Sequence, residues 1–182
     1  MILPIYLYGQ SILRKIAQPF DAEHYPNLQL LIDNMFETMH QADGVGLAAP
    51  QVGLNIRLIV IDASPLSEDF PEYKDKTLTL INPVITARSE ETDIMEEGCL
   101  SLPGIHENVE RAKWIHITYL DRSLKPHDED IDGYLARMVQ HEYDHIEGHL
   151  FTDRISPIRR TLLKGKLSNM AKGKTHCSYK TR

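Results

Sequence analysis

The strongest constraint on the fold is the stretch from Arg137 to Phe151, which contains His141, Glu142 and His145 in the spacing His-Glu-x-x-His. In a helix, residues four positions apart lie one turn apart on the same face, so both imidazoles can point at one metal ion. Glu142 is turned by about 100° around the helix axis, where its carboxylate can act on metal-bound water without being a ligand. The pattern predicts a helix that carries part of a metal site.

The apolar residues of this stretch support the helix. Asp132-Gly133 and Gly148 are typical start and stop signals. Between them, apolar residues recur at helical spacing on the side that carries the histidine pair: Leu135, Met138, Val139 and Ile146. We therefore expect a helix with ligands set into its buried face. Because the chain has nine histidines, two ordinary histidines without a metal remain the alternative from this motif alone.

Length and composition predict one globular catalytic domain over residues 1–182. With 182 residues, 42% of them hydrophobic and 25% charged, the chain can bury a core without disulfides. Its two cysteines do not form a disulfide framework, and no segment resembles a signal peptide or a membrane span. A reducing cytoplasmic location is expected, where a thiolate ligand survives.

The rest of the chain predicts a mixture of helices and strands. Residues 27–42 follow the spacing of an amphipathic helix, and residues 114–121 alternate as a strand does. Further strands are expected at 1–5, 57–62 and 78–87, the last bent at Asn82-Pro83. A short helix capped by Ser11 is expected at 11–17, an exposed loop at 63–76 and an acidic turn at 127–132.

A glycine-rich segment runs from Gly44 to Gly53 and contains three glycines and two alanines. Small residues let the backbone approach a ligand or another element closely. The segment lacks the Lys-Ser/Thr pair of a phosphate-binding loop. A ligand-binding segment and a tight connection both fit it.

A catalytic metal site needs a third protein ligand and one open position. The pattern His-Glu-x-x-His-x-x-Gly-x-x-His fails because its last position is Phe151, and a downstream glutamate ligand is excluded because no Glu follows Glu147. Cys99 is the best upstream candidate, since a thiolate suits Zn²⁺ or Fe²⁺ and Gly98 permits a tight turn. The remaining candidates are Asp153, His176 and Cys177.

Three segments together resemble the signature motifs of the peptide deformylase family: Gly44–Gly53, Glu97–Ser101 and Gln140–His145. They occur in the family's order and spacing, within a resemblance from about residue 2 to residue 165. The resemblance implies an α+β fold in which antiparallel β-sheets pack around a central metal-binding α-helix. It also implies removal of the N-formyl group from the N-terminal methionine of nascent polypeptides, by attack of metal-bound water or hydroxide on the formyl carbon. A general His-Glu-x-x-His metallopeptidase is the alternative, and a structural metal site in a binding module is a third hypothesis.

The resemblance also implies roles for individual residues. The metal ligands would be Cys99, His141 and His145, and the general acid and base would be Glu142. Gln51 and the backbone N–H of Leu100 would bind the oxyanion that forms on the formyl group. The implied ion is Fe²⁺, with Zn²⁺, Ni²⁺ or Co²⁺ as alternatives.

Substrate binding is implied for a second set of residues. Gly46 would hydrogen-bond the peptide backbone, and the methionine pocket would be lined by Val45, Met95, Tyr134 and Met138. Arg111 and Glu97 match family positions and are expected to pair behind the metal.

The charge is distributed unevenly along the chain. No acidic residue follows Asp153, whereas nine Lys or Arg do; removing these nine charges from the net charge of −6 leaves −15 on residues 1–153. We expect a helix with Leu162, Leu163 and Leu167 in this basic tail, and disorder over the last roughly fifteen residues. A solvated end and salt-sensitive contact with ribosomal RNA phosphate through residues 154–182 both fit the tail. Sequence-specific nucleic-acid binding and membrane binding are not expected.

Overall fold

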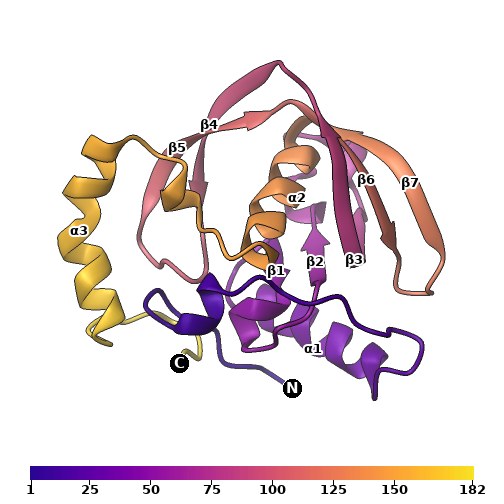
Figure 1. Ribbon diagram of the computed structural model, residues 1–182, viewed down its shortest axis with the longest axis horizontal. Helices are drawn as coiled ribbons and strands as arrows, with labels where there is room; N and C mark the ends of the chain where they lie inside the picture. The colour runs from indigo at the N-terminus through magenta and orange to yellow at the C-terminus, as the bar shows by residue number, and fades with distance from the viewer.

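The computed structural model describes residues 1–182, and Figure 1 shows helix α2 at its centre with strands on both sides. A five-stranded antiparallel sheet has the order β1-β2-β3-β6-β7 and a second sheet pairs β4 with β5. The strands are β1 (Gly46–Ala48), β2 (Leu58–Asp62), β3 (Thr77–Arg88), β4 (Thr92–Gly98), β5 (His106–Ala112), β6 (Trp114–Leu120) and β7 (Pro126–Asp132). The α-helices are α1 (Leu28–Gln41), α2 (Gly133–Ile146) and α3 (Pro157–Ala171). The predicted α+β fold, with antiparallel sheets packed around a central helix, is confirmed.

Strand β2 shows how the larger sheet holds two helices. Every residue of β2 is buried, and successive side chains of a strand point to opposite faces. Ile59 and Ile61 pack in the core cluster that contains α2, whereas Leu58 and Val60 pack in the cluster that contains α1. The unbroken apolar run of β2 therefore reflects a sheet covered on both faces.

Helix α2 begins and ends where the sequence predicts. Asp132 is its N-cap residue, and Gly148, just beyond its end, has a φ of 76°, a value that favours glycine. A Cβ on Gly148 would also lie 2.8 Å from the Arg14 carbonyl oxygen. The end of α2 is thus fixed by close contact with the N-terminal segment.

The predicted helix at 27–42 and the predicted strands at 57–62, 78–87 and 114–121 are confirmed by α1, β2, β3 and β6. Strand β3 bends where expected, with a register shift between Ile81 and Val84. Asn82 has a φ of 50°, and its side chain bonds both the N–H (3.1 Å) and the carbonyl (2.8 Å) of Phe20. The bend is therefore held by a tertiary contact as well as by the following proline.

The N-terminal segment is less regular than predicted. Only Ser11–Arg14 form a short 3₁₀ turn, and Gln10 rather than Ser11 is its N-cap. The chain leaves the helical path because the Ala17 N–H donates to the Ile146 carbonyl at 2.8 Å. Residues 1–5 make one isolated bridge, between Ile5 and Thr181, instead of an edge strand. Contacts with distant residues replace the predicted local structure at both places.

The prediction of a turn at 127–132 is wrong, because these residues form β7. This strand pairs antiparallel with β6 along its whole length. Ile131 is its one buried residue, and Asp128 and Asp130 each lie 2.6 Å from a ring nitrogen of His116 on the neighbouring strand. The acidic side chains thus cover the exposed face of an edge strand, where charge discourages pairing with another chain.

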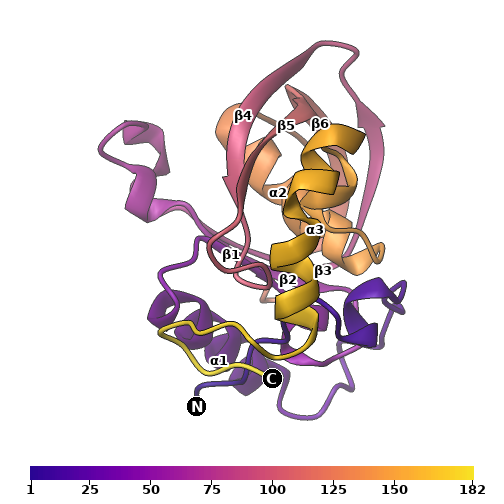
Figure 2. The ribbon, with the colours of Figure 1, turned by 90° about the vertical axis from the view of Figure 1, so that its left-hand side faces the viewer.

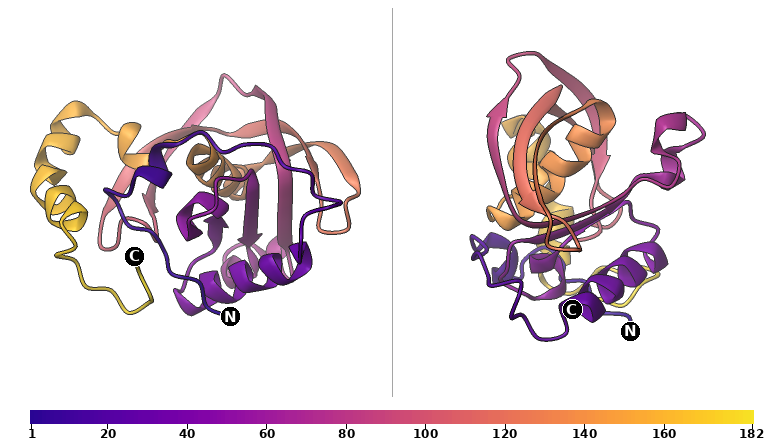
Figure 3. Two further views of the ribbon diagram at one scale, coloured as in Figure 1. Left: turned by 60° about the horizontal axis from the view of Figure 1, so that its bottom comes forward. Right: turned by 90° about the vertical axis from the view of Figure 1, so that its right-hand side faces the viewer.

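The basic C-terminal segment begins with α3, which packs beside β5 (Figure 2). Leu163, Leu167 and Met170 of α3 are buried, whereas Leu162 is exposed. The sequence suggested disorder in the last residues; in the structure they return to the N-terminal segment, and both termini lie on one side of the molecule (Figure 3). None of the three α-helices has the length and apolar character that crossing a bilayer requires.

Candidate active site

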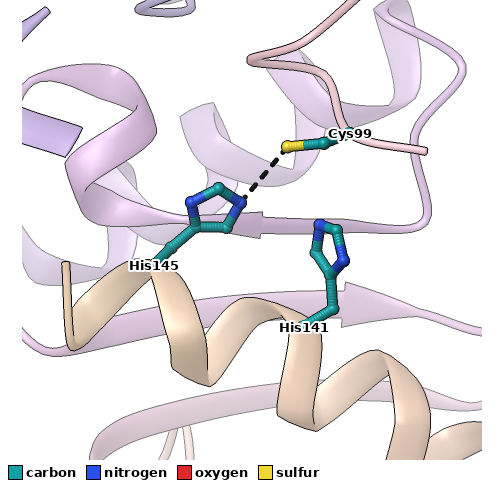
Figure 4. A group of neighbouring side chains, drawn as sticks. All are labelled: Cys99, His141 and His145. Carbon is teal, nitrogen blue, oxygen red and sulfur yellow. Dashed lines mark hydrogen bonds between the residues drawn. The ribbon is translucent and has the colours of Figure 1, made fainter. Parts of the chain in front are cut away.

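Three side chains meet between α2 and the loop that follows β4. One ligand atom from each of Cys99, His141 and His145 lies within 4.8 Å of the other two. The Cys99 Sγ is 3.3 Å from the Nε2 of His145, and the ring of His141 points to the same space (Figure 4). The two histidines come from successive turns of α2, whereas Cys99 is brought to them by the β4–β5 hairpin.

The environment of the two histidines leaves ring nitrogens available as ligands. Burial lowers the pKa of His145 to about 3, so its ring is neutral near pH 7. The Nδ1 of His141 lies 2.8 Å from Glu97 Oε2, which leaves Nε2 to face Cys99. Burial opposes a charge on His141, but Cys99 and Glu97 outweigh it and raise the pKa of this ring. A metal ion at this place would be attracted by the same negative groups, and it would displace the proton from His141 Nε2 on binding.

The donor set fits one divalent transition-metal ion. A thiolate and two imidazoles suit Zn²⁺ or Fe²⁺. Three protein ligands leave a coordination position for water or substrate, which is the pattern of catalytic rather than structural sites. Cys99, His141 and His145 therefore form a candidate catalytic metal centre.

A buried ionic network lies behind this centre. Glu97 accepts from Arg111 Nε at 2.6 Å and from Arg137 at 2.8 Å, in addition to its contact with His141. Burial alone would raise the pKa of Glu97, but the bonds from Arg111 and His141 hold it well below its usual range. A permanently charged Glu97 orients His141 and makes it a better donor. The predicted pairing of Arg111 with Glu97 is confirmed.

Sequence reasoning missed three members of this network. Asp144 accepts from Arg111 at 2.8 Å and from Arg154 Nε at 2.6 Å, and Arg137 is also buried. Arg137 and Asp144 lie four residues before and three residues after His141, on the helix face that carries the ligands. Charged residues on the same helix face as the histidine pair could have indicated buried ion pairs from the sequence alone.

Glu142 lies beside the ligands, with its carboxylate largely unpaired. The residue is buried, and its Oε2 has no hydrogen-bond partner. Burial raises the pKa of Glu142 to about 7, which suits a group that accepts and returns a proton near neutral pH. Strand β1 passes so close that a Cβ on Gly46 would lie 2.4 Å from Glu142 Oε1. The glycine-rich segment thus makes a close approach to the carboxylate.

Gln51 and Leu100 present hydrogen-bond donors near the Cys99 sulfur. The Gln51 amide oxygen accepts from the Ala48 N–H at 2.8 Å. This contact turns the amide nitrogen toward the Ser101 Oγ, at 3.2 Å, and the Cys99 Sγ, at 3.6 Å. The backbone N–H of Leu100 donates to no other backbone carbonyl. The Leu100 N–H is free for a developing negative charge, and the Gln51 amide nitrogen would turn one N–H to it from Ser101 or Cys99.

A pocket of about 370 Å³ opens over these residues. Val45, Gly46, Tyr134 and Met138 line it together with the ligands and Glu142. Met95, which was predicted to line it, does not: it lies on β4 with 37% of its surface exposed. The pocket also has walls that the sequence did not suggest, formed by Glu96, Pro103, Gly104, His106 and Tyr179.

Comparison with known proteins places this site in a family. The sequence profile described as polypeptide deformylase matches residues 2–161. The chain belongs to the polypeptide deformylase family. A peptide deformylase of Christiangramia forsetii is 47% identical, over 100% of this chain and 96% of that protein, and one of Salinibacter ruber is 45% identical, over 98% and 93%.

Solved structures of the family share the fold. A peptide deformylase crystal structure from Legionella pneumophila superposes with a TM-score of 0.81 at 40% identity, covering 94% of this chain and 96% of that one. A plant peptide deformylase, PDF1B, superposes with a TM-score of 0.84 at 37% identity, covering 94% and 90%. Membership in this metal-dependent family favours a deformylase over the general metallopeptidase considered from the sequence.

Proposed function

We propose that the chain hydrolyses the N-formyl group of formyl-methionyl nascent peptides, with Cys99, His141 and His145 holding one divalent ion. The observation that carries the proposal is the meeting of three ligand atoms within 4.8 Å beside Glu142, a buried carboxylate with an unpaired oxygen. Water adds to the formyl carbon and the bond from that carbon to nitrogen breaks. The products are formate and a peptide with a free N-terminal amine.

The side chains around the ion have separate tasks. When bound, the ion supplies Lewis acidity that makes water nucleophilic near neutral pH. Glu142 accepts a proton from the water and returns it to the departing amine nitrogen. The Gln51 amide nitrogen and the Leu100 N–H donate to the oxyanion on the former formyl oxygen.

The edge of the larger sheet supports an extended peptide substrate. Strand β1 is the terminal strand of that sheet, and the Val45 carbonyl accepts from the Asp62 N–H at 2.9 Å. Successive residues of a strand direct their backbone groups to opposite sides, so the N–H and carbonyl of Gly46 face away from β2. A peptide can pair there as an added strand. Val45, Tyr134 and Met138 then surround its methionine side chain.

The proposed function is tested with an anaerobic assay on formyl-Met-Ala-Ser, with metal content measured on the same sample. We expect stoichiometric formate and Met-Ala-Ser. Acetyl-Met-Ala-Ser and an unformylated heptapeptide serve as controls, which should remain intact. Cleavage of an internal peptide bond in the heptapeptide would indicate a metallopeptidase, and a metal-replete protein that releases no formate would refute the proposal.

Gly46→Ala should lower kcat/KM roughly ten- to a hundredfold, because small displacements of catalytic groups are costly. The added methyl group would lie 2.4 Å from Glu142 Oε1 and 2.9 Å from its Cδ, so the carboxylate must move. Metal content should not change, since no ligand is altered. Gly165→Ala is the control, because a Cβ there meets nothing within 4 Å. Equal kinetics of Gly46→Ala and the unaltered protein would contradict the close approach.

We further propose Fe²⁺ as the working ion, with Zn²⁺, Ni²⁺ or Co²⁺ able to occupy the same ligands. A thiolate-ligated Fe²⁺ site is open to oxidation by oxygen and peroxide, at the metal or at the sulfur of Cys99. We expect the Fe²⁺ form to lose activity in air faster than the Ni²⁺ form. Activity of both forms is followed over time with and without catalase. Equal lifetimes would argue against iron oxidation as the weak point.

We also propose that the basic segment 154–182 contacts ribosomal RNA phosphate. Arg159 and Arg160 are less available to bind phosphate than the sequence suggested. Arg159 pairs with Glu107 at 2.8 Å, and Arg160 donates to the backbone carbonyls of residues 152 and 153. Five exposed lysines without an ion pair remain on α3 and after it, and Lys164, Lys172 and Lys174 are three of them. These three lysines support salt-sensitive binding to phosphate.

Changing Lys164, Lys172 and Lys174 together to Glu should weaken binding to ribosomes and flatten its salt dependence. Activity on formyl-Met-Ala-Ser should not change. The matched control carries three Lys→Glu changes at exposed positions far along the chain: Lys74, Lys76 and Lys125. Sedimentation with ribosomes at several salt concentrations measures the affinity. The same loss in both triple variants would indicate a general effect of charge, and no loss in either would leave the tail without a ribosomal role.

A further inference from the structure

The last residues of the chain form a layered contact with the active-site loops. The N–H of Ile5 donates to the Lys180 carbonyl at 2.9 Å and that of Leu7 to the Arg182 carbonyl at 3.1 Å. The intervening N–H of Tyr6 donates to the Gln51 carbonyl at 2.8 Å on the opposite side. Residues 5–8 therefore lie between the tail and the loops that carry Gln51 and Ser101. Figure 3 shows the N-terminal segment passing near the end of the tail.

This layering brings Tyr179 into the active-site pocket. The side chain is half-buried and lines the pocket together with Leu100, Gly104 and His106. Its hydroxyl donates to the Leu100 carbonyl at 2.6 Å. Burial raises the pKa of Tyr179, so the hydroxyl keeps its proton and remains a donor. Residue 179 lies beyond the segment 2–161 that matches the family profile.

The side chain of Leu100 packs against the core cluster that contains α1, but its main chain makes no backbone–backbone hydrogen bond. The Leu102 N–H donates to the Cys99 carbonyl at 3.0 Å, and the Tyr8 N–H donates to the Ser101 carbonyl at 2.9 Å. The Leu100 carbonyl accepts one hydrogen bond, from the side chain of Tyr179. Without the Tyr179 bond, the peptide unit that follows Leu100 gains freedom to rotate. The preceding unit, which carries the Leu100 N–H, is then held by one backbone hydrogen bond, from the Leu102 N–H to the Cys99 carbonyl, so the direction of the Leu100 N–H is less firmly fixed.

We propose that Tyr179 is a positioning residue for hydrolysis, which fixes Leu100 so that its N–H points at the oxyanion. The inference rests on the proposed function, because it concerns the oxyanion formed from the formyl group. Donors that are aligned before the reaction stabilise the transition state more than the bound substrate. Loss of the Tyr179 hydroxyl must therefore act on kcat and leave KM nearly unchanged.

The test compares Tyr179→Phe with Tyr25→Phe on formyl-Met-Ala-Ser, using the full chain with measured metal content. Tyr25 packs against Phe20 and does not line the pocket. We expect Tyr179→Phe to lower kcat roughly three- to tenfold, the effect of one hydrogen bond, with KM within about twofold. Tyr25→Phe should match the unaltered protein. Thermal unfolding of both variants checks that the fold is retained. Tyr179→Leu, which keeps an apolar side chain but has neither ring nor hydroxyl, should have a kcat no higher than that of Tyr179→Phe.

The outcomes separate the inference from the proposed function. Formate release by the unaltered protein supports the function whatever the variants do. An unchanged kcat in Tyr179→Phe overturns the positioning role, as does a rise in KM with kcat unchanged, which would make Tyr179 a substrate-binding residue. An equal loss in Tyr25→Phe also overturns it. Absence of formate release by the unaltered protein would instead remove the proposed function, and the inference with it.

Discussion

Glu142→Gln is expected to keep its metal and to lose activity about 10²–10⁴-fold, the usual worth of general acid–base catalysis. Glutamine has nearly the same shape, so the packing against Gly46 and the positions of His141 and His145 on α2 are retained. A carboxamide cannot accept a proton from water and return it to the leaving nitrogen. The loss should appear in kcat, because the missing step follows substrate binding.

The comparison that tests this role uses metal analysis and kinetics on the same preparations. Glu90→Gln, on an exposed residue between β3 and β4, removes the same charge far from the pocket and should behave as the unaltered protein. A Glu142→Gln protein that binds metal and turns over at a near-normal rate would exclude Glu142 from proton transfer. Loss of the metal in this variant would instead assign Glu142 a role in holding the ligands.

Gln51→Ala is expected to lower kcat by roughly 10²–10³-fold, as removal of one oxyanion donor does, with a much smaller change in KM. The amide nitrogen lies 3.6 Å from Cys99 Sγ, and the bond from the Ala48 N–H at 2.8 Å fixes which end of the amide faces the site. The donor is therefore oriented before substrate binds, and its effect should be concentrated in the transition state.

A second variant separates this role from structural support. Gln51 also donates to the Ser101 Oγ at 3.2 Å, so its removal disturbs the loop that carries Cys99. Ser101→Ala breaks only that bond and should reduce kcat by much less than Gln51→Ala. Equal losses of kcat in the two variants would show that Gln51 acts only by supporting the loop that carries Cys99. A rise in KM alone would make it a binding residue.

The parts of the fold that could be predicted are those determined by residues close together in the sequence. Helix α2 combines helical apolar spacing with capping signals, and β2 is an uninterrupted apolar run. The metal centre was suggested by the ligand chemistry of Cys99 and the histidine pair, and by the family motifs. The predictions that were wrong concern segments whose structure depends on contacts with distant residues. The predicted helix at 11–17, for example, ends early because the Ala17 N–H donates to the Ile146 carbonyl.

The missed parts of the site have the same cause. The acidic sequence of β7 is typical of a turn when it is considered alone. It forms a strand because it pairs with β6, where His116 contacts two of its aspartates. Nothing in the sequence near residue 179 indicates that Tyr179 reaches Leu100, because the contact depends on pairing of residues 180–182 with residues 5–7. The position of Met95 outside the pocket follows from the path of β4, which local sequence does not fix.

The pairing between residues 5–7 and 180–182 closes a loop of almost the whole chain, and few hydrogen bonds hold it. Backbone units with so few bonds open and reclose far more often than the whole protein unfolds. The amide protons of Ile5, Leu7 and Arg182 should thus exchange with solvent faster than those of β2, which is buried on both faces. Each such opening carries Tyr179 away from Leu100 while the metal ligands, on α2 and the β4–β5 hairpin, stay in place. The candidate active site thus has a durable part, formed by the residues that would hold the ion, and a part that is repeatedly made and lost at equilibrium.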